Sequence, residues 1–176
     1  MTSSIAECLI HCLRVTVAYG DKLTTDIPAE EFAHIPHPGM NHPAFCIGHL
    51  SLYPNELLRL LGRQKLIIDK EGFLSVFRSG TQCVEQDGRY PPKQDIVDFY
   101  LERHYVLSDA IADVGDELLD LMERPPHSSF KRWFPTAGAA LVYYLNNHHM
   151  QHLGQLSAWR RVMGLRPLKW GDPDAS

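Results

Sequence analysis

The apolar residues of this sequence recur at helical spacing in four long stretches, and no credible strand pattern lies between them. The stretches cover about residues 4–23, 41–61, 93–122 and 136–163. In the last stretch the inward-facing positions are separated alternately by four and three residues, which is the seam spacing of packed helices. These positions are Leu141, Leu145, His148, His152, Gln155 or Leu156, Trp159 and Met163. Four amphipathic helices without strands predict an all-α fold, with a four-helix bundle as its natural architecture.

Residues with known preferences for helix ends set the predicted boundaries. Asn41 is a good N-cap for the second helix. Pro54 lies inside that helix and predicts a kink one turn after His49, because proline removes a backbone donor. The fourth helix is predicted to begin after an N-cap at Thr136 and to stop at Gly164.

Composition and charge exclude several classes of protein. The chain has 176 residues, enough for a single domain, 1–176, that buries its own core. A net charge of −4 without a cluster of Lys or Arg argues against a nucleic-acid binder. No apolar run reaches the ~18 residues of a membrane span, and no secretory signal is visible. We therefore expect a cytoplasmic protein without membrane contact, with reduced cysteines and with disorder only at Gly171–Ser176.

Two segments between the predicted helices are rich in residues that break helices. Loop 34–42 contains His34, His37 and His42 beside prolines, and these histidines are expected to be solvated. Segment 63–92 holds several glycines and a Pro-Pro pair with phenylalanines between them. We expect it to form a long excursion that contains one short helix.

Three histidines occupy positions where a helical bundle normally has apolar side chains. His148 and His152 are four residues apart, so their rings project from one face of the fourth helix and can reach one metal ion. His49 lies on the apolar stripe of the second helix. A buried imidazole without a partner costs about 1–3 kcal/mol, so three inward histidines favour a shared metal ion. Three neutral imidazoles that leave coordination positions open suit zinc, nickel or iron(II).

Other residues on the same faces are candidates for supporting roles. No Glu follows His148, which excludes an HExxH protease motif, and the sequence lacks the Glu-x-x-His motifs on two helices that ferritin-like proteins need. His149 is rotated by about 100° from His148 and should face a different neighbour. Glu56 lies two turns after His49 and either orients a ligand imidazole or points outward. The residues expected to line a substrate pocket are Phe45, Glu56, Tyr144, Gln155 and Trp159.

Two segments of the sequence resemble the DinB family. The first is Asn41-His42-Pro43-Ala44-Phe45-Cys46-Ile47-Gly48-His49-Leu50, which contains the Gly-His-Leu step of that family's second helix. The second is His148-x-x-x-His152-Leu153-Gly154-Gln155-Leu156, followed by Trp159-Arg160-Arg161 and Gly164, which is similar to the family's last helix. The two motifs occur in order on separate predicted helices, and the order of elements agrees over nearly the whole chain.

The resemblance implies a four-helix bundle with a long crossover between helices 2 and 3, a homodimer, and one metal ion held by His49, His148 and His152. Relatives with a known activity use low-molecular-weight thiols, as thiol S-transferases or thiol-dependent isomerases. The resemblance therefore implies a transferase that activates a small thiol on its metal and acts on a small-molecule substrate. Two alternatives stay open: a hydrolase that uses metal-bound hydroxide, and a non-enzymatic metal-bound protein involved in ligand binding or stress.

Overall fold

A computed structural model describes residues 4–126 and 130–168 of the chain, and these residues contain helices and no strand. The all-α prediction is therefore confirmed for the described part of the chain. None of the described helices has the length and apolar character needed to cross a membrane. The disorder expected for Gly171–Ser176 concerns residues outside the described ranges.

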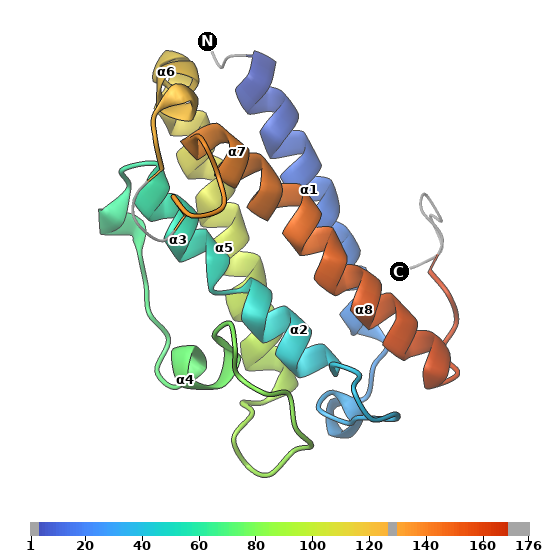
Figure 1. The fold of residues 1–176 in the computed structure, drawn as a ribbon. Coiled ribbons are helices and arrows are strands. Elements are labelled where there is room, and N and C mark those ends of the chain that lie inside the picture. The colour runs from blue at the N-terminus through green and yellow to red at the C-terminus, as the bar shows by residue number, and fades with distance from the viewer. Residues whose placement is uncertain (1–3, 127–129, 169–176) are drawn as a thin grey trace.

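Helices from distant parts of the chain lie side by side and enclose the core (Figure 1). The main helices are α1 (Ser4–Thr25), α2 (Pro43–Leu50), α3 (Tyr53–Leu60), α5 (Lys93–Val114) and α8 (His149–Val162). α1 packs along α5, whereas α2 contacts both α5 and α8. Side chains that are fully buried among these helices include Leu13, Ile47, Tyr100, Ile111 and Leu156.

The second predicted helix is divided into α2 and α3 by a turn at Ser51 and Leu52. Pro54 lies in the first turn of α3, where its missing N–H is harmless, so the predicted kink is confirmed as a complete break. Figure 1 shows α3 as a separate helix that follows the end of α2 after a short link. His49 therefore stands in the last turn of a short helix.

The N-cap of α2 is His42 and not Asn41, which corrects the prediction. A residue before proline is driven toward extended backbone, and His42 has φ −82° and ψ 163°. Its Nδ1 accepts a hydrogen bond from the Phe45 amide, while Nε2 donates to the Val84 carbonyl oxygen over 2.9 Å. His42 is fully buried, so the expectation of a solvated histidine was wrong at this position.

The third predicted helix is also interrupted. α5 ends at Val114, and Gly115 adopts φ 61° and ψ −134°, which side-chain-bearing residues rarely adopt. A 3-10 turn η3 (Gly115–Glu117) and α6 (Leu118–Glu123) follow. The apolar periodicity continues across the break because Val114 and Leu118 are both buried, which is why the sequence suggested one helix to Met122.

The fourth predicted helix has the expected ends and an unexpected middle. Thr136 caps α7 (Ala137–Val142) by accepting a hydrogen bond from the Ala139 amide, as predicted. Six residues of π-helix, η4 (Tyr143–His148), then join α7 to α8. Gly164 follows α8 with φ 75°, which agrees with its predicted role as a stop.

The long segment between α3 and α5 contains the expected short helix, α4 (Phe73–Phe77), and a 3-10 turn, η2 (Gln64–Leu66). Phe73 and Phe77 are buried. The ring of Phe73 packs edge-on against Phe99 of α5, and α4 contacts α2. This segment therefore brings its backbone next to the helix that carries His49.

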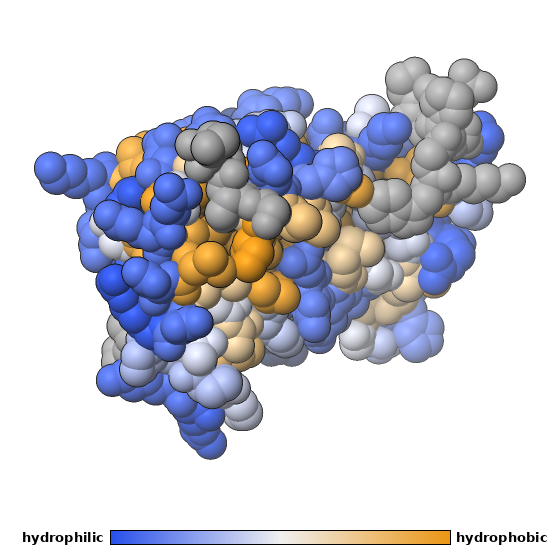
Figure 2. All heavy atoms as spheres, turned by 90° about the horizontal axis from the view of Figure 1, so that it is seen from above, coloured by the Kyte–Doolittle hydropathy of each residue, from blue (hydrophilic) through white to orange (hydrophobic). Residues whose placement is uncertain are grey.

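Some of the exposed apolar residues lie at or between α6 and α7. Leu119, Met122 and Val142 line an open groove between these helices, and Trp133 is 69% exposed. The face seen from above in Figure 2 carries a group of apolar side chains among hydrophilic ones.

Candidate metal centre

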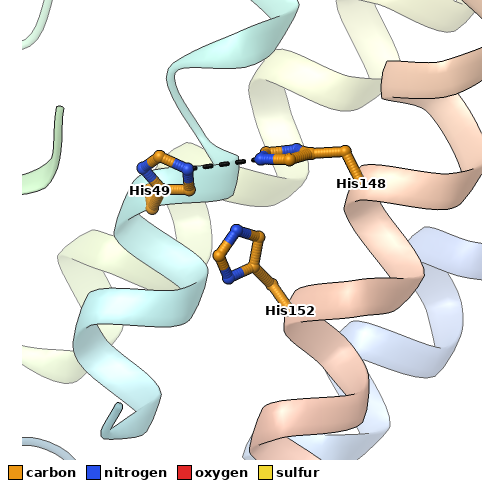
Figure 3. Close-up of side chains that lie close together, drawn as sticks. All are labelled: His49, His148 and His152. Atoms are coloured by element: carbon orange, nitrogen blue, oxygen red, sulfur yellow. Dashed lines mark hydrogen bonds between the residues drawn. The ribbon is translucent and has the colours of Figure 1, made fainter. Parts of the chain in front are cut away.

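His49, His148 and His152 point toward one another from two sides of the helical assembly (Figure 3). His49 is in the last turn of α2, His148 is the last residue of η4, and His152 is in the first turn of α8. One nitrogen from each ring lies within 4.8 Å of the other two. The Nε2 atoms of His49 and His148 are 3.4 Å apart, and the ring of His152 is centred 4.7 Å from each of the other rings.

Two of the three rings are held by hydrogen bonds on the side that faces away from the cluster. Nδ1 of His49 donates to the Phe77 carbonyl oxygen over 2.7 Å. Nδ1 of His152 donates to Oε1 of Gln155 over 3.1 Å. Because both partners are oxygens that accept, the proton of each ring resides on Nδ1 and the lone pair on Nε2. Such partners orient metal-ligating histidines and raise their basicity.

Burial keeps the three imidazoles neutral. Loss of solvation lowers the pKa of His148 to about 3, with further lowering from His152 and His49. The pKa of His152 is lowered to about 4 for the same first reason, and the pKa of His49 is also lowered. Neutral imidazole is the form that binds a metal ion. The three rings therefore fit a divalent transition metal both in their charge state and in the way that their nitrogens point toward one another.

The buried polar atoms of His148 add a second indication. Its Nδ1 has no hydrogen-bond partner among the described residues. Its Nε2 faces Nε2 of His49, where two lone pairs meet unless a proton or a cation lies between them. Two buried lone pairs that face each other are costly, and a cation shared by the two Nε2 atoms would remove that cost.

Gln155, a predicted pocket residue, lies behind His152 and joins it to α2. Its Oε1 accepts from His152, from Asn41 over 3.2 Å and from the Cys46 thiol over 3.8 Å. Burial raises the pKa of Cys46, so this thiol stays protonated and acts as a donor. The three donors fix the amide and, through it, the ring of His152.

Aromatic rings surround the cluster on its other sides. Phe45, predicted for the pocket, stacks parallel to His49 with ring centres 6.1 Å apart. Tyr144, also predicted, lies 5.2 Å from the ring of His148 and stacks on Tyr53. Tyr53 was missed, although its ring is 5.0 Å from His49 and 4.3 Å from His148. Its position four residues after His49 was a sequence signal that would have identified it.

A pocket of about 230 Å³ opens beside His49 and Tyr53. Glu56 lines this pocket, and its carboxylate is paired with Arg59 and contacts none of the three histidines. Trp159 lies elsewhere: its indole is fully buried and donates to the His34 carbonyl oxygen over 2.8 Å. Trp159 therefore contributes to packing between α8 and the first loop.

The neighbouring His149 faces away from the cluster, as its rotation on the helix predicted. It is buried, and its Nε2 lies 2.6 Å from the hydroxyl of Tyr100 on α5. His104 is buried in the same region, with Nδ1 donating to the Tyr100 carbonyl oxygen over 2.6 Å. The contact between His149 and Tyr100 joins the first turn of α8 to α5.

Comparison with protein families gives one match. The model of the DinB superfamily matches residues 13–156, which include all three histidines and most of the described helices. No curated protein and no solved structure matches the chain. Since the family model covers well over half of the sequence, the chain belongs to the DinB superfamily.

Proposed function

We propose that this protein is a metal-dependent enzyme that transfers a small thiol to a small-molecule substrate. One observation carries the proposal: three neutral imidazoles direct nitrogens toward a common point, with ligand atoms within 4.8 Å of one another. His49, His148 and His152 would hold one divalent ion, with zinc or nickel favoured and iron(II) also accommodated. Three protein ligands leave a coordination position for a reactant.

A bound divalent ion lowers the pKa of a thiol or water that it ligates, so that a thiolate or hydroxide is available at neutral pH. The protein residues orient and shield. Phe77 and Gln155 fix the tautomers of two ligand rings through their oxygens. Tyr53 and Phe45 exclude water from two sides of the cluster.

The surroundings of the cluster favour a thiol over water as the nucleophile. A hydrolase usually positions a carboxylate or imidazole as general base for the attacking water. Among the described residues the pocket holds two carboxylates: Glu56, which is paired with Arg59, and Asp69, which accepts a hydrogen bond from Asn55. A thiol needs no such base once the metal has lowered its pKa.

Membership of the superfamily supports two finer structural proposals. The first is a four-helix bundle in which segment 63–92 forms the crossover between the second and third helical runs. The second is a homodimer, which sedimentation of the full chain would test.

Metal content measured by mass spectrometry tests the site. Protein purified without an affinity tag is expected to carry about one equivalent of a transition metal, and His148→Ala is expected to lose it. His11→Ala is the control, because His11 is exposed on α1. Wild-type protein that stays metal-free after incubation with zinc or nickel would overturn the proposal.

Activity assays then separate the three functions. Transfer of a thiol to an electrophile panel that requires both metal and His148 supports the transferase. Ester or amide turnover without any thiol would replace it with the hydrolase. Tight metal and ligand binding without turnover of either kind would assign a non-enzymatic role.

A further inference from the structure

The pocket beside His49 has several charged residues in its lining. Five of its residues carry a charge at neutral pH, and the remainder of its wall is partly apolar. The cationic residues are Arg59, Lys70 and Arg78, and the acidic ones are Glu56 and Asp69. The lining is therefore net positive, in a chain whose net charge is −4.

Two of the three cations have no carboxylate partner among the described residues. Arg59 is paired with Glu56. Lys70 donates to the Asp95 backbone carbonyl over 2.9 Å and lies 5.0 Å from the ring centre of Phe73, so its charge is not neutralised. Arg78 is exposed, and its guanidinium group makes no hydrogen bond or ion pair with a described residue. Lys70 and Arg78 both line this pocket of about 230 Å³.

The position of Arg78 in the chain links it to the metal centre. It directly follows Phe77, whose carbonyl oxygen receives the hydrogen bond from His49. Ser79, the next residue, also lines the pocket. The segment that orients a candidate metal ligand therefore also presents a free guanidinium group at the pocket wall.

The rest of the wall is suited to an apolar body. Leu52, Leu74 and Phe99 line the pocket, and Leu74 is 64% exposed in spite of its apolar side chain. The pocket therefore combines apolar side chains with cationic ones, as sites for amphipathic small molecules do.

We propose that this pocket binds a carboxylate group of the substrate through Arg78 and Lys70. Resting on the proposed thiol transfer, this defines the substrate class as a small organic acid with an apolar body. The carboxylate belongs either to the electrophile or to the thiol. In either case the end of the molecule that lacks the carboxylate would lie toward His49. Arg78 binds the carboxylate by charge-assisted hydrogen bonds, for which its planar group is well suited.

Binding to the full-length protein, measured by calorimetry without turnover, tests the proposal. In one arm 3-phenylpropanoate is compared with its neutral amide, and in the other 3-sulfanylpropanoate is compared with its amide. We expect the acid to bind at least about tenfold more tightly than the amide in one arm, which identifies the reactant that carries the carboxylate. Arg78→Gln should remove this preference, Arg78→Lys should keep part of it, and Arg161→Gln, on the exposed surface of α8, should not change it.

Two results would overturn the proposal. One is equal binding of acid and amide in both arms. The other is a preference that survives Arg78→Gln, because the carboxylate would then bind elsewhere, for example to the metal. Since no turnover is measured, a protein that binds acids through Arg78 without transferring a thiol would refute the proposed function and leave the anion site established.

Discussion

Replacing Gly48 with alanine tests how closely the candidate metal centre depends on the packing of α2 against α4. A Cβ atom at position 48 would lie 2.5 Å from Cε1 of Phe77, with two further ring atoms at 2.6 Å. Carbon atoms pack at about 3.5 Å or more, so the ring has to retreat by about 1 Å. It has little room, because it is buried among the rings of Phe45, Phe73 and Tyr90.

The retreat of the Phe77 ring has two measurable effects. Overpacking of this kind costs about 1–3 kcal/mol, and the better helix propensity of alanine offsets at most about 1 kcal/mol. We therefore expect Gly48→Ala to lower the free energy of unfolding by about 1–2 kcal/mol. The Phe77 carbonyl moves with its ring, which weakens the 2.7 Å hydrogen bond from His49. Loss of such a partner lowers metal affinity about 10- to 100-fold.

Gly154→Ala is the matched control, because a Cβ atom there meets nothing within 4 Å and the residue lies in α8 near His152. In urea unfolding, Gly154→Ala should leave the free energy of unfolding unchanged or raise it slightly. In competition with a chromophoric zinc chelator, its zinc affinity should equal that of the wild type. Phe77→Leu in the Gly48→Ala background should relieve the clash. The double variant should then be more stable, by about 0.5 kcal/mol or more, than the sum of the two single effects on the free energy of unfolding predicts. The reasoning is refuted if Gly48→Ala behaves like Gly154→Ala in both assays, or if the two changes add without coupling.

Three further perturbations test other parts of the structure. Gln155→Ala should lower metal affinity about 10- to 100-fold by releasing the ring of His152, whereas Gln155→Glu should preserve it; equal affinities in chelator competition would count against this role. Because burial lowers the pKa of His104 from 6.5 to about 4, the folded state loses up to about 3 kcal/mol as pH falls from 6.5 to 4. His104→Gln should therefore flatten the acid limb of the stability curve and His11→Gln should not, and identical limbs would disprove the assignment. Thr136→Ala should cost about 1 kcal/mol in urea unfolding through loss of the α7 cap, and an unchanged midpoint would show that the cap is dispensable.

The parts of the fold that depend on local spacing were predictable from the sequence. Four-and-three periodicity identified the helical runs, and Pro54 correctly marked the break after His49. The i, i+4 spacing of His148 and His152, with His49 on another apolar stripe, predicted that these three rings lie close together, as they do. That these rings bind a metal, and that the chain is a single domain, stay predictions.

The parts that depend on contacts between distant segments could not be predicted. The partner of His49 is a backbone carbonyl 28 residues away, and any residue type supplies a carbonyl. His42 was expected in solvent because its loop is polar, yet the ring is buried by segment 83–90. Gly115 was overlooked because buried residues on both sides of it keep the helical period.

The π-helical segment η4 places one extra residue in the helical run that carries His148 and His152. Its hydrogen bonds span five residues instead of four, so η4 accommodates one residue more than an α-helix of equal rise. The residues before Tyr143 and those after His148 therefore lie on nearly the same faces as they would in a continuous α-helix that is one residue shorter. Deleting one residue within η4 would let such a helix form with little rotation of one half against the other, whereas a deletion in the α-helical turns of α8 would rotate the halves by about 100°. An alignment with a relative that lacks the extra residue needs a gap within η4. Without that gap, residues on one side of η4 would be paired with the wrong positions of the relative, although every side chain of the site would be present in both sequences.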